Sequence, residues 1–96
     1  MSEGYRHLYI VRCVDGSLFT GVTDDPDTIV AELNAGNGPV YTRSRCPVFL
    51  VYCEEYMNGR DAERRAAEIR DMSRKQKEGV LAMANTAVLD SFAFGV

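Results

Sequence analysis

Two short runs of β-prone residues stand on either side of Asp15-Gly16, and this arrangement restricts the fold more than any other feature of the sequence. The first run covers residues 5–13 and is rich in Tyr, Ile and Val, and the second covers residues 18–22. Asp and Gly accept the positive φ angles of a type I′ turn, so the pair predicts a hairpin of two antiparallel strands.

Turn and cap signals predict the next elements. Asp25 is expected to cap a helix that has Pro26 at its first position, runs to residue 33 or 35 and stops at Gly36. Residues 37–39, Asn-Gly-Pro, extend that break into a loop. Residues 47–55 are apolar and β-branched enough to predict a third strand, which we expect to be the central or most buried one.

The remaining sequence predicts helices. Residues 61–72 are good helix formers, and residues 74–83 follow Ser73, which is expected to be an N-cap. The order is β-β-α-β-α-α, which predicts a single α/β (α+β) domain over residues 1–83, with a three-stranded antiparallel sheet flanked by helices. Residues 84–96 form an apolar tail that we expect to dock on the domain or on a partner.

Length and charge narrow the range of functions. A chain of 96 residues fits one domain, and it contains neither a run of eighteen apolar residues nor a secretory leader, so we expect a cytoplasmic location and no membrane. The three cysteines form no CxxC pair, which argues against a zinc site. The net charge of −3 disfavours tight non-specific DNA binding, although Arg43, Arg45 and the basic residues within 60–77 form local clusters.

Several segments resemble a known family in the same order and at matching spacing. Leu8-Tyr9-Ile10 and Phe19-Thr20-Gly21 are similar to the paired tripeptides that name the GIY-YIG nuclease superfamily, particularly its small stand-alone bacterial members. Further similar segments lie at residues 15–23, 31–38, 41–43, 47–52, 64–70 and 73–74. The resemblance covers nearly everything from residue 5 to residue 81 and implies a GIY-YIG-like fold.

The resemblance also implies a catalytic site, and most of that site is absent. In the family, two tyrosines, an arginine, usually a histidine or tyrosine one turn later, and a metal-binding glutamate act together on a phosphodiester. Tyr9 keeps the first tyrosine, but Phe19 lacks the second hydroxyl, Ile29 stands in place of the arginine, and Leu33 in place of the histidine. Ala66 stands where the glutamate is expected, so we predict no metal site and no cofactor.

The first hypothesis is a catalytically inactive GIY-YIG-like domain that acts through binding. Phe19, Ile29, Leu33 and Ala66 are all apolar and, in the family geometry, converge on the former active-site face. An exposed apolar patch of this kind marks a contact with a protein partner or with a second copy of the chain. The alternative that Ile29 and Leu33 are core residues of an amphipathic helix stays open.

Two other hypotheses keep a role for DNA. One is a structure-selective DNA endonuclease dependent on Mg²⁺ or Mn²⁺, with Tyr9, Arg43 and a carboxylate from Glu63 or Glu68. The other is a DNA-binding module without cleavage, because a tyrosine and two arginines are able to stack on bases and pair with phosphates. Its candidate residues are Tyr41, Arg43 and Arg45.

Overall fold

A three-stranded antiparallel sheet forms the centre of the protein. The computed structural model describes residues 5–83. The strands are β1 (Arg6–Cys13), β2 (Leu18–Thr23) and β3 (Val48–Tyr56), and they lie in the order β2-β1-β3. Both pairings are antiparallel, as the sequence predicted.

The hairpin between β1 and β2 has a different turn from the predicted type I′. The Gly16 N–H donates to the Cys13 carbonyl at 2.9 Å, and the Cys13 N–H donates to the Ser17 carbonyl at 2.8 Å. Gly16 has φ +88°, whereas no non-glycine residue in the described part of the chain has positive φ. The connection is therefore a three-residue loop ending in a left-handed glycine, because Val14 supplies an extra residue and Asp15 keeps an ordinary backbone conformation.

The third strand lies at an edge of the sheet, so its predicted central position was wrong. β1 is paired on both sides and is buried from Leu8 to Val11, whereas β3 exposes Phe49 and Leu50. A register shift opposite Ile10 and Val11 also interrupts the strict alternation of β3. Apolar composition alone did not separate an edge strand from a central one.

The first helix begins and ends at the predicted signals. α1 (Pro26–Asn34) starts after Asp25, whose carboxylate accepts a hydrogen bond from the Asp27 N–H at 3.1 Å. Gly36 follows the helix with φ +87°. The sequence did not predict the next helix, α2 (Val40–Arg43), because a single turn of helix carries no apolar periodicity.

Two helices complete the domain. α3 (Gly59–Arg70) begins two residues before the predicted start, because the Asn58 side chain caps it by accepting a hydrogen bond from the Asp61 N–H at 2.9 Å. A further helix begins at Arg74 and continues through the described residues to position 83. Ser73 caps it as predicted, since its hydroxyl accepts from the Gln76 N–H at 3.2 Å and the Gln76 side chain accepts from the Ser73 N–H.

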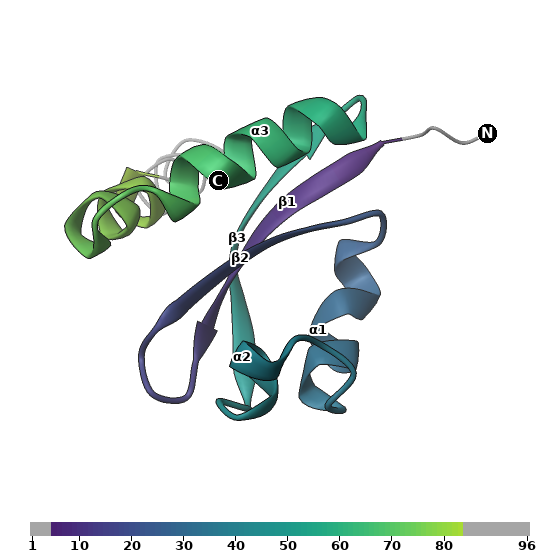
Figure 1. Ribbon diagram of the computed structural model, residues 1–96, viewed down its shortest axis with the longest axis vertical. Coiled ribbons are helices and arrows are strands. Elements are labelled where there is room, and N and C mark those ends of the chain that lie inside the picture. Colours follow the sequence, from purple (N-terminus) through teal and green to yellow (C-terminus); the bar gives the residue numbers. More distant parts are fainter. Residues whose placement is uncertain (1–4, 84–96) are drawn as a thin grey trace, which may run out of the picture.

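The helices cover both faces of the sheet (Figure 1). α3 and the helix after it pack on the face that carries Leu8 and Ile10, and α1 and α2 pack on the face that carries Tyr9 and Val11. This division follows from strand geometry, since successive side chains of β1 point to opposite faces. The predicted docking of residues 84–96 lies outside the described residues.

Candidate functional site

Four of the five predicted catalytic positions share one apolar cluster between the sheet and α1. Tyr9 and Leu33 belong to its buried part, with exposed fractions of 4% and 1%, and Phe19 and Ile29 are partly buried against them. The rings of Tyr9 and Phe19 have centroids 6.3 Å apart. Leu33 is therefore a core residue, which is the alternative that the sequence left open for it.

Ala66 lies in the other apolar cluster, so the expected convergence of the replaced positions was wrong for this residue. It is fully buried with Leu8, Ile10 and Ile69 on the α3 face of the sheet. The physical reason is the alternation of β1, which sends Tyr9 and its neighbour Ile10 to opposite faces. A side chain at position 66 contacts the aliphatic core rather than Tyr9.

Tyr9 is packed closely against the backbone of β2. A Cβ built on Gly21, its partner across the strands, would lie 2.5 Å from the Tyr9 Oη. Burial raises the pKa of the Tyr9 phenol above its ordinary value, and the positive charge of Arg70 offsets only part of that rise. The hydroxyl therefore stays protonated at neutral pH.

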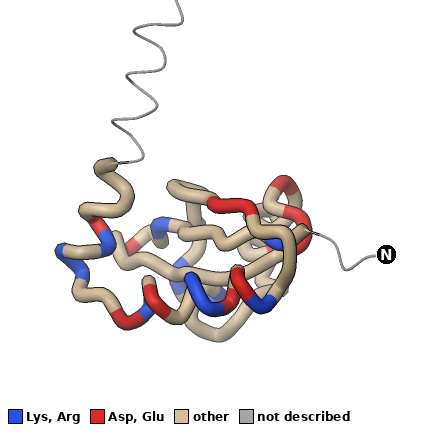
Figure 2. The backbone as a smooth tube through the Cα atoms, turned by 90° about the horizontal axis from the view of Figure 1, so that it is seen from above, with Lys and Arg blue, Asp and Glu red and all other residues tan. Residues whose placement is uncertain are grey.

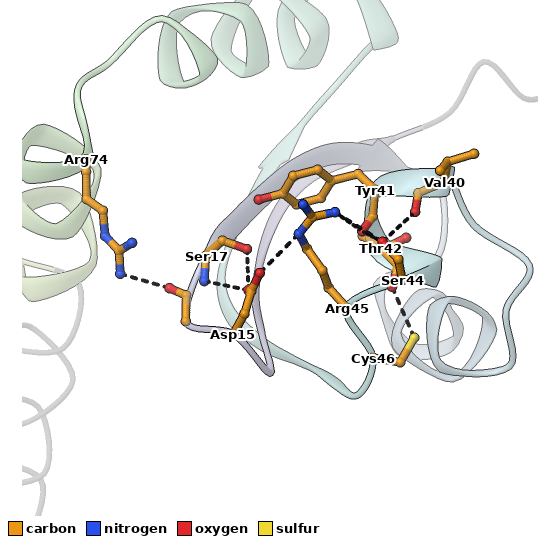
Figure 3. Close-up of polar contacts among 10 residues, drawn as sticks. Asp15, Ser17, Val40, Tyr41, Thr42, Ser44, Arg45, Cys46 and Arg74 are labelled. Carbon is orange, nitrogen blue, oxygen red and sulfur yellow. Dashed lines mark hydrogen bonds and ion pairs between the residues drawn. The ribbon is translucent and has the colours of Figure 1, made fainter.

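Tyr41 and Arg45, two of the predicted DNA-binding residues, lie together at the end of the β1–β2 hairpin (Figure 3). The Tyr41 ring stacks on Phe19 with centroids 5.9 Å apart, and the Arg45 guanidinium carbon lies 3.9 Å from the Tyr41 ring centroid. Arg45 also donates to Asp15 at 3.1 Å. Arg43 is exposed, and its side chain makes no hydrogen bond or ion pair with the residues of the described range.

Beside this ring pair lies a cleft of about 390 Å³, lined by Leu18, Phe19, Thr20, Tyr41, Arg70 and Lys77. A smaller hollow of about 200 Å³ adjoins it and is lined by Ser17, Leu18, Tyr41, Arg74 and Lys77. Together they place two aromatic rings next to three basic side chains. We call this surface the aromatic–basic cleft, defined by Phe19, Tyr41, Arg70, Arg74 and Lys77.

The cations of the aromatic–basic cleft are only partly neutralised. Arg70 donates through Nε and Nη2 to the Thr20 carbonyl at 3.3 and 3.2 Å, and within residues 5–83 neither Arg70 nor Lys77 has a carboxylate partner. Arg74 donates to the Gly16 carbonyl at 2.9 Å and lies 3.6 Å from Glu78. The cleft consequently carries a local positive charge in a chain whose net charge is −3.

The sequence did not assign Arg70 and Lys77 to a site. They lie in a run of charges that reads as the solvated face of two helices. The chain turns at residues 71–73, between α3 and the next helix, and basic positions gather on both sides of that turn (Figure 2). The sequence contained one signal for this arrangement, the predicted N-cap at Ser73. A cap there implies a turn between α3 and the next helix, and that turn brings the basic residues of the two helices close together.

A second polar cluster lies between β3 and α3. The hydroxyls of Tyr52 and Tyr56 both donate to the Glu54 carboxylate, and Arg65 pairs with Glu54 at 3.3 Å and with Glu68 at 3.0 Å. We call these five residues the Glu54 cluster. Within it, the charges and hydroxyls satisfy one another, so the cluster offers no open position to a ligand.

The same contacts shift the pKa values of the Glu54 cluster. Burial, followed by the hydrogen bonds to Glu54, raises the pKa of Tyr52 and of Tyr56 to about 12. Burial pushes the Glu54 pKa upward, but the hydrogen bonds from Tyr52, Tyr56 and Arg65 outweigh it and leave that pKa below its ordinary value. Glu54 is therefore a carboxylate at neutral pH.

The carboxylates proposed for a rescued metal site lie outside the aromatic–basic cleft. Glu68 is paired with Arg65, and Glu63 is exposed on α3. Among residues 5–83, no three His, Cys, Asp or Glu side chains come together as a metal site would need. None of the helices in the same range has the length and apolar character required to cross a bilayer.

Comparison with known proteins gives the family. No family model matches the sequence. A UPF0213 protein of Halobacterium salinarum is 45% identical over 75 residues, which cover 78% of this chain and 97% of the relative. A UPF0213 protein of Staphylococcus haemolyticus is 46% identical over 72 residues, covering 75% of this chain and 88% of the relative. The chain belongs to the UPF0213 family.

Solved structures agree with this family assignment. The solution NMR structure of a UPF0213 protein from Bacillus halodurans is 34% identical, with a TM-score of 0.56 over 82% of this chain and 84% of that one. The solution NMR structure of a protein from E. faecalis is 31% identical, with a TM-score of 0.58 over 85% and 88% of the two chains. The two UPF0213 relatives from Halobacterium and Staphylococcus consist of little beyond the segment that this chain matches.

Proposed function

We propose that this domain is a degenerate relative of the GIY-YIG nucleases that binds unpaired DNA strands in the aromatic–basic cleft without hydrolysing them. The observation that carries the proposal is one cleft that joins the stacked rings of Phe19 and Tyr41 to Arg70 and Lys77. Proteins that hold single strands combine aromatic surfaces for bases with cations that follow the phosphates.

Arg70 suits a phosphate ligand because it is held in place without being neutralised. Its partner is the Thr20 carbonyl, a neutral acceptor that fixes the guanidinium at the rim of the cleft. A phosphate oxygen adds a charge-assisted hydrogen bond, which is about twice as strong as a neutral one. Lys77 supplies a second positive charge from the neighbouring helix, so two phosphates of one strand have partners.

The replaced positions support binding without cleavage. Phe19 has no hydroxyl, Leu33 is buried in the core with the partly buried Ile29 packed against it, and Ala66 lies on the other face of the sheet. Hydrolysis of a phosphodiester needs groups that neutralise the charge developing on the phosphate and groups that activate water. Burial raises the pKa of the Tyr9 phenol, which disfavours the phenolate that a base or a metal ligand would need.

The proposal predicts modest affinity with a weak dependence on salt. The net charge of −3 repels DNA at long range, while the few cations of the cleft attract it locally. Micromolar dissociation constants at low salt are therefore expected, with a shallow dependence on salt because few counterions are released.

Fluorescence anisotropy with a labelled single strand of about 20 nucleotides tests the proposal. Titrations at about 50 mM salt and at higher salt, with a duplex of the same sequence alongside, give affinity, salt slope and strand preference. The same DNA, together with branched and supercoiled substrates, is incubated with Mg²⁺ or Mn²⁺ and analysed on gels. We expect binding that favours the single strand, and intact DNA.

Two results would contradict the proposal. Nicking that disappears in Tyr9→Phe would restore the metal-dependent endonuclease hypothesis. Absence of binding at low salt, by protein with a native circular dichroism spectrum, would remove any role for DNA.

Fewer of the predicted residues now support the hypothesis of protein binding. Leu33 is not accessible to a partner, but Phe19 and Ile29 remain partly exposed. Sedimentation of the wild type and of Ile29→Glu over a range of concentrations separates the cases. A concentration-dependent dimer that Ile29→Glu breaks, without unfolding the chain, would favour self-association at this face.

A further inference from the structure

Asp15 occupies the tip of the β1–β2 hairpin and divides its two carboxylate oxygens between two tasks. Oδ1 accepts from the Ser17 N–H at 3.0 Å and from the Ser17 hydroxyl at 2.6 Å, which closes the turn. Oδ2 accepts from the Arg45 Nε at 3.1 Å. The Ser17 bonds, followed by the charge of Arg45, hold the pKa of Asp15 below its ordinary value, so it is a carboxylate at neutral pH.

Arg45 is held in position by contacts that do not need Asp15. Its Nη1 donates to the Tyr41 carbonyl at 3.0 Å and to the Ser44 hydroxyl at 3.1 Å, and its guanidinium lies over the Tyr41 ring. The Arg45 carbonyl also accepts from the Val14 N–H at 3.1 Å, which joins the loop to the hairpin. Loss of the ion pair with Asp15 therefore leaves Arg45 beside the Tyr41 ring.

One edge of the Arg45 guanidinium is only half used. Asp15 contacts Nε, while Nη2 on the same edge makes no hydrogen bond with the described residues. A phosphate spans Nε and Nη2 with two parallel hydrogen bonds, which is a better acceptor geometry than the single contact. The ion pair is also partly exposed, with side-chain exposures of 34% and 46%, so little free energy opposes its exchange.

The ion pair of Asp15 and Arg45 lies beside Ser17 and Tyr41 (Figure 3). Ser17 and Tyr41, which contact Asp15 and Arg45 respectively, both line the hollow that contains Arg74 and Lys77. Arg74 itself donates to the carbonyl of Gly16, the residue after Asp15. A strand lying on Lys77 and Tyr41 thus passes next to Arg45.

We propose that Asp15 stands in the place of a DNA phosphate in the free protein, and that a phosphate of the bound strand displaces it from Arg45. This inference rests on the function proposed above and assigns Arg45 as a third phosphate contact. Asp15 then reduces affinity in two ways, because it competes for Arg45 and repels the strand. Asp15 also adds selectivity, because Arg45 contacts only a ligand that brings a phosphate close enough to displace the Asp15 carboxylate.

Asp15→Asn tests the exchange with a minimal change. The asparagine carbonyl replaces Oδ1 and still accepts from Ser17, whereas the amide group in place of Oδ2 cannot accept from Arg45. We expect single-strand affinity to rise roughly fivefold at low salt, with the salt slope nearly unchanged, because Arg45 contacts a phosphate in the wild-type complex as well. Asp24→Asn is the matched control, since it removes the same charge from an exposed residue outside the cleft.

A double-mutant cycle with Arg45→Gln separates exchange from simple repulsion. If Asp15 acts through Arg45, the gain in affinity disappears in Asp15→Asn/Arg45→Gln. A gain that survives in that double variant, or equals the gain of Asp24→Asn, would overturn the inference and leave DNA binding in place. If neither the wild type nor Asp15→Asn binds, the proposed function fails together with the inference. Urea unfolding of each variant checks that the fold is intact.

Discussion

Two arginines on one helix have opposite surroundings. Arg65 of α3 pairs with Glu54 and Glu68, whereas Arg70, five residues later, has only the Thr20 carbonyl. The strands beneath them explain the difference. β3 turns Tyr52, Glu54 and Tyr56 toward α3, while the residues that β2 turns toward the same helix are Leu18, Thr20 and Val22.

The comparison separates a charge used for folding from a charge left for binding. The charge of Arg65 is satisfied within the chain, so its removal is expected to affect stability. Arg70 is positioned by a neutral acceptor and keeps its capacity to bind an anion. Variants at these two positions of α3 should therefore change different measurements.

The largest effect is expected from Glu54→Ala. The change leaves the Arg65 guanidinium and two tyrosine hydroxyls without their shared acceptor in a partly buried setting. The free energy of unfolding should fall by about 2 kcal/mol, as measured by urea denaturation. Glu55→Ala on the exposed face of β3 is the control and should change stability by less than about 0.5 kcal/mol. Equal losses of unfolding free energy in the two variants would mean that the Glu54 cluster contributes little to stability.

Arg70→Gln/Lys77→Gln should produce the second largest effect, on DNA binding instead of stability. Loss of two phosphate contacts is expected to weaken single-strand binding about tenfold and to reduce the salt slope by about 1.4. Lys75→Gln, on the same helix as Lys77 but outside the cleft lining, should leave the affinity within about twofold. An affinity loss in Lys75→Gln as large as in the double variant would indicate general attraction rather than a cleft.

Alkaline pH should weaken the Glu54 cluster, which joins β3 to α3. Tyr52 and Tyr56 titrate at about 12 in the folded chain and near 10 when unfolded, so their contribution is complete below pH 10 and is lost as pH rises toward 12. The loss should be of the order of 1 kcal/mol after allowance for partial exposure. Ultraviolet titration of tyrosinate should show late midpoints for Tyr52 and Tyr56 that move toward 10 in Glu54→Gln, whereas the late titration of Tyr9 should not change. Midpoints of Tyr52 and Tyr56 that do not change in Glu54→Gln would contradict the hydrogen bonds from these two tyrosines to Glu54.

The smallest effect is expected at acid pH. The Glu54 pKa lies below its ordinary value of 4.5, so its contribution is present above that value and is lost as pH falls through the folded pKa. The wild type should lose more stability than Glu54→Gln between pH 5 and 3, as followed by thermal unfolding in matched buffers. Parallel curves would mean that Glu54 contributes no acid sensitivity.

The sequence predicted those parts of the fold that depend on local signals. The caps at Asp25 and Ser73 and the hairpin at Asp15-Gly16 each act within a few residues, and each was found. The position of β3 at the edge of the sheet depends on its pairing with the distant β1, and the apolar composition of a segment does not specify which strand it pairs with. The cleft was missed for a similar reason, since Arg70 and Lys77 meet Phe19 only through tertiary packing.

The close approach of Tyr9 to Gly21 has a consequence for sequence drift. Because the ring fills the space that a Cβ would need, position 21 admits no side chain while position 9 carries a large ring. A methyl group at position 21 fits the sheet only after position 9 has lost its ring. Of the two single variants on the way to a double variant, the one that changes Tyr9 first is therefore expected to fold, and the one that changes Gly21 first is not. The two strands of the hairpin are therefore expected to diverge together at this pair and separately elsewhere.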